Sequence, residues 1–255
     1  MRIKHSEQLF DLLEAKYIQY NRFEFIEDDP ISIPHQFSKK EDIEIAGFLA
    51  ATIAWGQRKT IITNANKMLQ IMDYAPHDFI LNHTEKDLPR TEGFVHRTFN
   101  SSDLNYFFTA LQNIYTLHGG LEKAFLLHEK TEHAVSLFKQ LFFSFNHGKR
   151  TQKHVADPIK KSTAKRINMY LRWTVRQDIM GVDFGIWKNH APANLMLPLD
   201  VHTGNVGRSL GLLNRKQNDW QAVEELTSAL RIYDAKDPVK YDFALFGIGV
   251  NKELV

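Results

Sequence analysis

Apolar residues recur every three or four positions in nearly every long segment of the chain, which is the period of an amphipathic α-helix. The segment 40–55 is apolar around much of its circumference, as a central buried helix would be. Asp103 and Asp237 stand where the third and the last of these helices need a cap, and Pro238 follows Asp237 at the first helical position. Helices are therefore expected at 6–19, 40–55, 103–117, 132–145, 164–178, 200–213, 219–233 and 238–248.

Strand signals are poor by comparison. The segment PISIPHQF (30–37) alternates apolar and polar residues, but its two prolines favour a loop. The polar and basic segment 146–163, interrupted by Pro158, separates an aromatic-rich front half from the back half of the chain. These features predict an all-α protein.

The length and composition are those of an ordinary globular protein. A chain of 255 residues can form one large domain or two small ones. It has no apolar run of about 18 residues that would span a membrane, and its first residues lack the apolar centre of a signal peptide. The absence of cysteine excludes disulfides, thiolate nucleophiles and cysteine-held iron–sulfur clusters. We therefore expect a cytoplasmic location and expect that the protein does not bind a membrane.

Positive charge is concentrated in one region, although the net charge is only +2. Between His147 and Arg176 only Asp157 opposes the basic residues, which are Lys149, Arg150, Lys153, Lys160, Lys161, Lys165, Arg166, Arg172 and Arg176. Such an excess is typical of a surface that binds a phosphate-rich partner. A solvated charged face is the alternative interpretation.

The helix expected at 164–178 has one apolar face, and its opposite face carries Lys165, Arg172 and Arg176. Ser162 or Thr163 can cap it. Lys165 would then lie in the first turn, where the helix dipole and neighbouring cations disfavour an ammonium ion. A neutral amine at this position could act as a nucleophile. The alternative is a lysine that only neutralises phosphate or faces solvent.

The segment LMLPLDVHTGNVGRSLGLL (195–213) places Asp200 directly after an apolar run and at the start of a helix. An N-cap explains this position, and a cap can also direct a charged oxygen into a site. Gly204 and Gly207 weaken a helix unless another element approaches closely. His202 is expected to face the core or to support the site.

Together, the helix-initial Lys165 and the downstream LDVH that contains Asp200 resemble the helix-hairpin-helix (HhH-GPD) DNA glycosylase superfamily, which includes the endonuclease III and 8-oxoguanine glycosylase groups. The chain is most similar to an uncharacterised bacterial branch of it. The segment 44–69 looks like the family's early helix pair, whose turn enters DNA, and Gln57 is the residue nearest to that role.

The resemblance implies two helical subdomains with a cleft between them, made of residues 42–163 and of 1–41 plus 164–255. It implies a DNA base-excision glycosylase, with or without lyase activity, that acts on a flipped damaged base, such as an oxidised purine, in double-stranded DNA without a cofactor or metal. Lys165 would attack C1′ and Asp200 would assist. The residues expected to bind DNA are Lys160, Lys161, Arg166, Arg172, Arg176 and Gln57, and those expected to line the base pocket or support it are His202, Trp55 and Trp173.

The chain departs from the family pattern in three respects. The hairpin reads DPIKKSTAK (157–165) and lacks the family's two glycines, so Lys160, Lys161 and helix N–H groups would have to contact the phosphate. The separation of 35 residues between Lys165 and Asp200 is longer than in endonuclease III. No cysteine cluster follows the last helix.

Two other functions are compatible with the sequence. A nucleic-acid-binding protein of the same fold without catalysis would keep the basic surface. An HD-type metal-dependent phosphohydrolase would use the chain's His77-Asp78 dipeptide, although Pro76 places that pair at a helix start, where both residue types are common for capping.

Overall fold

The computed structural model describes residues 6–253, and helices account for almost all of its regular structure. The all-α class is therefore confirmed. The chain forms two compact units: unit 1 comprises Met1–Phe25, Lys130–Glu132 and Asp157–Val255, and unit 2 comprises Ile26–Glu129 and His133–Ala156. Within residues 6–253, no helix is both long enough and apolar enough to cross a lipid bilayer.

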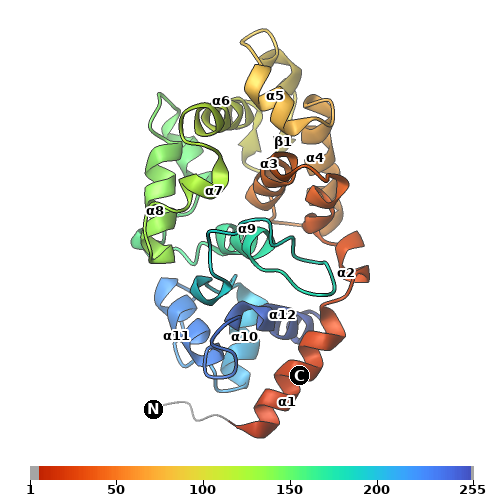
Figure 1. Cartoon of the computed structure of the whole chain (residues 1–255), viewed down its shortest axis with the longest axis vertical. Helices are drawn as coiled ribbons and strands as arrows, with labels where there is room; N and C mark the ends of the chain where they lie inside the picture. Colours follow the sequence, from red (N-terminus) through yellow and green to blue (C-terminus); the bar gives the residue numbers. More distant parts are fainter. Residues whose placement is uncertain (1–5, 254–255) are drawn as a thin grey trace. The chain divides into compact units, whose positions relative to one another are not determined.

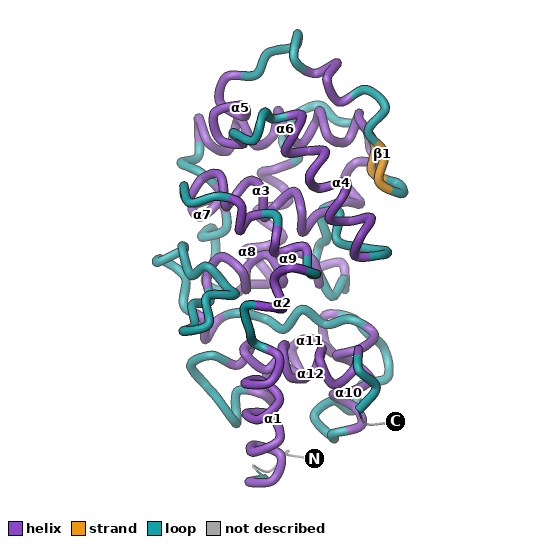
Figure 2. Tube along the Cα trace, turned by 90° about the vertical axis from the view of Figure 1, so that its right-hand side faces the viewer, coloured by secondary structure: helices purple, strands orange, loops and turns teal. Residues whose placement is uncertain are grey.

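Unit 2 contains most of the residues coloured orange, yellow and green in Figure 1. Its α-helices are α3 (Lys40–Thr52), α4 (Arg58–Ile71), α5 (Pro76–Asn82), α6 (Ser101–Leu117), α7 (Leu121–Ala124) and most of α8 (Thr131–Phe142). Its 3-10 helices are η1 (Pro30–Ser32), η2 (Pro34–Gln36), η3 (Leu88–Thr91) and η4 (Lys149–His154). The two-residue strands β1 (Val95–His96) and β2 (Phe99–Asn100) pair antiparallel, and β1 lies beside α4 (Figure 2).

Unit 1 contains the remaining helices. They are α1 (Glu7–Tyr20), η5 (Pro158–Lys160), α9 (Lys165–Val175), η6 (Pro192–Asn194), α10 (Val201–Ser209), α11 (Trp220–Leu230), η7 (Pro238–Tyr241) and α12 (Asp242–Val250). The short helix α2 (Glu24–Glu27) spans the boundary between the units.

The core of unit 2 is built on α3, as its apolar circumference predicted. The Phe48 side chain of α3 is fully buried, and its ring lies 5.9 Å from that of Phe107 and 5.5 Å from that of Phe142. Phe107 and Phe142 are themselves 4.8 Å apart. These rings come from α3, α6 and α8, so burying them ties the three helices together.

Glycines bring the helices of unit 1 close together. A Cβ at Gly247 of α12 would lie 2.1 Å from Cδ2 of Tyr20 in α1, so only glycine allows this approach. A Cβ at Gly207 of α10 would lie 3.1 Å from Cδ1 of Leu226 in α11. The close approach expected from the glycines of α10 is thus confirmed at Gly207.

Several helix ends differ from the expected ones. The N-cap of α6 is Asn100, and Asp103 is the third helical residue and completes a capping box. Helix α10 ends at Ser209 because Gly211 takes φ +70° and the backbone N–H of Leu212 turns back to the carbonyl of Gly207. Neither Ser162 nor Thr163 caps α9, whose N-cap is Ala164 in a left-handed conformation without a side-chain cap.

Candidate active site

The side chains of Lys165 and Asp200 meet in unit 1. Nζ of Lys165 lies 3.2 Å from Oδ2 of Asp200. Both side chains remain accessible, with 33% and 18% of their surface exposed. An amine and a carboxylate from distant parts of the chain therefore form an ion pair that a ligand can reach.

Asp200 uses its two oxygens differently. Its Oδ1 accepts a hydrogen bond of 3.0 Å from the backbone N–H of Thr203, and the backbone N–H of Asp200 donates one of 2.8 Å to the Thr203 hydroxyl oxygen. This capping box fixes the carboxylate at the start of α10. The other oxygen, Oδ2, is the one that faces Lys165. Asp200 is both an N-cap and a member of the ion pair.

A tight hairpin positions Lys165 at the start of α9. Asp157 caps η5 by accepting a hydrogen bond from the N–H of Ile159, and its carbonyl oxygen accepts one from Ser162. Lys161 (φ +66°) and Ala164 (φ +47°) both adopt left-handed conformations. Two residues that carry a Cβ thus take left-handed backbone in a hairpin without glycine.

Sequence reasoning missed a second carboxyl group at this site. Asp242, the first residue of α12, is buried, and burial raises its pKa to about 6. Arg172 acts against this shift, while the charges of Asp200 and Lys165 act on Asp242 in opposite directions. No local pattern indicated it, because its position depends on the packing of α10 against α12.

Arg172 and Arg176 were predicted to bind DNA, and this prediction is wrong. Both side chains are buried, at 4% and 1% exposure. Arg172 donates to Asp183 and, at 2.5 Å, to Asp242. Each arginine is therefore committed to carboxylates inside unit 1.

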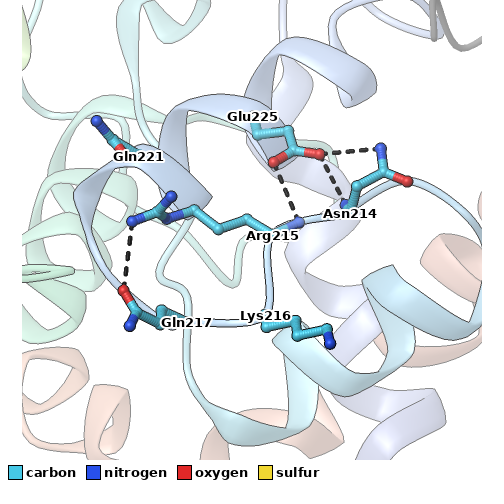
Figure 3. A pocket seen from close by; sticks show the side chains of 6 residues that line it. All are labelled: Asn214, Arg215, Lys216, Gln217, Gln221 and Glu225. Carbon is cyan, nitrogen blue, oxygen red and sulfur yellow. Dashed lines mark hydrogen bonds between the residues drawn. The ribbon is translucent and has the colours of Figure 1, made fainter.

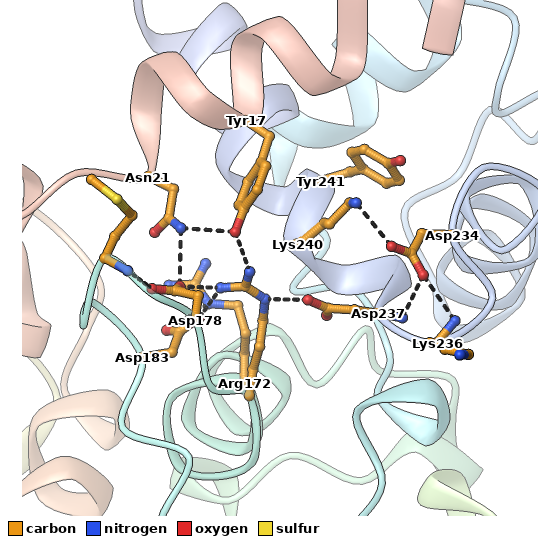
Figure 4. Close-up of polar contacts among 12 residues, drawn as sticks. Tyr17, Asn21, Arg172, Asp178, Asp183, Asp234, Lys236, Asp237, Lys240 and Tyr241 are labelled. Carbon is orange, nitrogen blue, oxygen red and sulfur yellow. Dashed lines mark hydrogen bonds and ion pairs between the residues drawn. The ribbon is translucent and has the colours of Figure 1, made fainter. Parts of the chain in front are cut away.

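Arg176 is the centre of a buried network, whose members Tyr17, Asp178, Asp183 and Asp237 are labelled in Figure 4. Its guanidinium donates to Asp237 at 2.8 Å, to Asp183 at 2.9 Å and to Asp178 at 2.5 Å, and to the hydroxyl of Tyr17 at 2.7 Å. Burial opposes the charge of Arg176, but Asp183 and Asp237 outweigh it and raise its pKa. Asp237, expected as a helix cap, makes no cap bond and pairs with Arg176 instead.

The other basic residues predicted to bind DNA lie at or near the surface. Lys160 and Lys161 are exposed in the hairpin that precedes α9. Arg166 is partly exposed, and burial lowers its pKa to about 10. These positions leave a phosphate-binding role open to the three residues.

Among the residues predicted for the base pocket, Trp173 is 1% exposed in the core, so it cannot stack on a base. His202 is exposed, so it does not face the core, and its ring meets that of Phe246 edge-on. Trp55 is partly exposed in unit 2, where its ring lies 6.0 Å from that of His154.

Gln57 also belongs to unit 2. It is exposed at the N-cap of α4, between the two helices of the expected pair, and makes no side-chain cap bond. The helix pair itself is confirmed as α3 and α4.

The His77-Asp78 dipeptide lies at the start of α5, as Pro76 predicted. Nδ1 of His77 is 2.8 Å from Nζ of Lys39, and the Asp78 carboxylate accepts a bond from Asn82. Among residues 6–253, no group of three or more His, Asp or Glu side chains is arranged to hold a metal ion.

Comparison with known proteins identifies a family whose model matches most of the chain. Residues 29–251 match the model of a family described as a protein of unknown function, DUF2400. No curated protein and no solved structure matches the chain. The matched range contains both Lys165 and Asp200.

Proposed function

We propose a function for this chain, which belongs to the DUF2400 family: it is a DNA base-excision glycosylase with a helix-hairpin-helix fold, and it uses Lys165 as nucleophile and Asp200 as proton acceptor. The observation that carries the proposal is the accessible ion pair of 3.2 Å between these side chains. Nucleophile and base within hydrogen-bond reach are the arrangement that covalent catalysis needs.

The chemistry begins with the transfer of one proton from the Lys165 ammonium to Asp200. The neutral amine then attacks C1′ of the damaged nucleotide, and the bond between C1′ and the base breaks with its electron pair going to the base. The departing base takes up a proton, for which the Asp200 carboxyl group is the nearest donor. One proton of Nζ then passes to the ring oxygen O4′, the C1′–O4′ bond breaks, and a protonated Schiff base forms between C1′ and Nζ. Removal of a C2′ proton by a base then breaks the C3′–O bond in β-elimination, and the 3′ phosphate leaves with the electron pair.

This reaction requires the nucleotide to leave the duplex, which costs a few kcal/mol. Electrostatic attraction to the DNA backbone offsets that cost. Lys160 and Lys161, exposed in the hairpin directly before Lys165, are placed to supply it. The left-handed residues Lys161 and Ala164 support the same assignment, because left-handed residues in a turn can direct backbone N–H groups toward an anion.

The test is covalent trapping. The protein is incubated with duplexes that carry 8-oxoguanine, uracil, thymine glycol or an abasic site in the presence of borohydride, which reduces a Schiff base to a stable amine. We expect an adduct on Lys165, located by mass spectrometry of the digested protein. Lys165→Gln should abolish the adduct and base release. Asp200→Asn should also abolish turnover while preserving the cap, since asparagine is an equally good N-cap.

Thr203→Ala is the matched control, because it removes one partner of the capping box and leaves the Asp200 carboxylate in place. It should lower the stability of the fold and retain the adduct. Normal cleavage by Lys165→Gln or Asp200→Asn would overturn the proposal. DNA binding by the wild type without an adduct or base release on any duplex would identify a non-catalytic binding protein instead.

A further inference from the structure

The loop between α10 and α11 is held rigidly from two sides. Arg208 of α10 donates to the carbonyl oxygens of Arg215 (2.8 Å) and Lys216 (2.9 Å). From the other side, the Glu225 carboxylate of α11 accepts hydrogen bonds from the backbone N–H groups of Asn214 (2.7 Å) and Arg215 (3.3 Å). The backbone of residues 214–216 is thus fixed before any ligand arrives.

The same loop lies next to the Lys165–Asp200 pair. The Asn218 side chain donates to the carbonyl oxygen of Asp200 at 3.4 Å. The backbone N–H of Trp220, at the start of α11, donates to the carbonyl oxygen of Lys161 in the hairpin at 3.3 Å. Two backbone contacts therefore connect the loop to the segments that present the nucleophile and its carboxylate.

A polar cavity of about 670 Å³ opens at this loop (Figure 3). We call it the 214–221 pocket, and it is lined by Asn214, Arg215, Lys216, Gln217, Gln221 and Glu225. The Arg215 guanidinium is paired with Asp219, and Glu225 is occupied by the loop backbone.

Two lining side chains remain available. Among the residues that the structure describes, none pairs with the Lys216 ammonium or with the Gln221 amide, and both residues are exposed. The carboxylates of this region are mostly occupied: Asp200 pairs with Lys165, Asp219 with Arg215, and Glu225 binds the loop backbone. Asp157 caps η5, and Glu224 is exposed on α11. An unpaired ammonium and a neutral amide, with the exposed lysines of the hairpin close by, suit an anionic, hydrogen-bonding ligand.

We propose that the 214–221 pocket binds the sugar-phosphate backbone of the DNA strand next to the nucleotide that Lys165 attacks. Lys216 neutralises a phosphate there and the Gln221 amide donates a hydrogen bond to it. The choice of DNA as ligand rests on the proposed function. The volume of about 670 Å³ lies within the range of roughly 300–1,000 Å³ typical of ligand sites, so it accommodates a phosphodiester with its sugar.

The test measures affinity against salt. Fluorescence anisotropy of a fluorescein-labelled duplex with one tetrahydrofuran abasic-site analogue gives Kd at a series of KCl concentrations. Lys216→Ala should lower the slope of log Kd against log[KCl] by about 0.9, the contribution of one phosphate contact. Gln221→Ala should raise Kd by about 2- to 10-fold with the slope unchanged, because the lost hydrogen bond is neutral at the protein end. Lys236→Ala, at an exposed lysine elsewhere in unit 1, is the control and should change neither.

Borohydride trapping on an abasic-site duplex separates this proposal from the preceding one. If the salt slope of Lys216→Ala equals that of the control Lys236→Ala, the proposed phosphate site in the pocket is wrong, even if Lys165 forms its adduct. A reduced slope without any adduct in the wild type would support the pocket and overturn only the glycosylase function.

Discussion

Asp242 carries a negative charge in a place that favours the neutral carboxyl group. Burial is the main cause of its raised pKa of about 6, and the neighbouring Asp200 carboxylate adds to it. Arg172, which donates to Asp242 at 2.5 Å, recovers part of the cost. Ionised Asp242 therefore places a charge beside the candidate site at the expense of folding free energy.

This cost predicts a pH dependence. The pKa of Asp242 is about 6 in the folded protein and 3.8 for an ordinary aspartate, so its stabilising contribution is complete below about pH 4 and is lost as the pH rises through 6. Asp242→Asn does not titrate. The difference in unfolding free energy between Asp242→Asn and the wild type should therefore shift in favour of the variant by about 2 kcal/mol when the pH rises from about 4.5 to about 7.

Urea unfolding at both pH values measures this difference. The comparison between the two pH values cancels the constant effect of losing the carboxylate next to Arg172. A stability difference between Asp242→Asn and the wild type that is independent of pH would show that Asp242 does not ionise in this range.

Single residues were predictable where their environment is local. The capping role of Asp200 follows from the residues around it, since Thr203 lies only three positions away. Arg172 and Arg176 show the opposite case. A helical projection shows that two arginines share a face with Lys165, but it does not show that carboxylates on other segments cover that face.

At the level of elements, the hairpin before α9 achieves with strained residues what glycines achieve without strain. Lys161 (φ +66°) and Ala164 (φ +47°) lie in the left-handed region, where a residue with a Cβ pays about 1–2 kcal/mol. The hairpin therefore adopts left-handed backbone at two positions although its sequence contains no glycine. Propensity alone could not indicate this, because the hydrogen bonds from Lys161 and Ser162 back to residues 158 and 157 hold the conformation.

Lys161→Gly should raise stability and weaken DNA binding. Relief of the left-handed strain outweighs the extra chain entropy of glycine, about 0.5–1 kcal/mol, and leaves a net gain of about 0.5–1 kcal/mol in unfolding free energy. The loss of one cation should lower the salt slope of DNA binding by about 0.9.

Urea unfolding checks the first effect and anisotropy the second. Lys160→Gly is the matched control, since Lys160 has an ordinary helical backbone in η5 and glycine there should destabilise. A loss of stability in Lys161→Gly equal to that of Lys160→Gly would contradict the strain argument.

Across the whole molecule, periodicity predicted the all-α class and the buried helix α3, because local sequence determines which face of a helix is apolar. The helix pair that α3 forms with α4 was expected from the family resemblance. The meeting of Lys165 and Asp200 was expected only through the family resemblance. The buried network of unit 1 was not expected, since its members are spread over the chain: Tyr17 on α1, Asp183 in a loop and Asp237 before η7 surround Arg176. No sequence period relates positions so far apart.

That network makes Arg176 the residue on which the integrity of unit 1 depends. Arg176→Met keeps most of the apolar stem but leaves the buried Asp183 without its cation, together with Asp178 and Asp237. Removing one partner of a buried ion pair costs about 3–5 kcal/mol, so the urea midpoint of unfolding should fall sharply. The stability of Arg176→Lys, which keeps the charge and loses the forked geometry, should lie between that of the wild type and that of Arg176→Met.

Lys236→Met is the control, because it exchanges an exposed lysine of the same unit and should change the unfolding free energy little. If Arg176→Met proves as stable as Lys236→Met, the network does not hold unit 1 together.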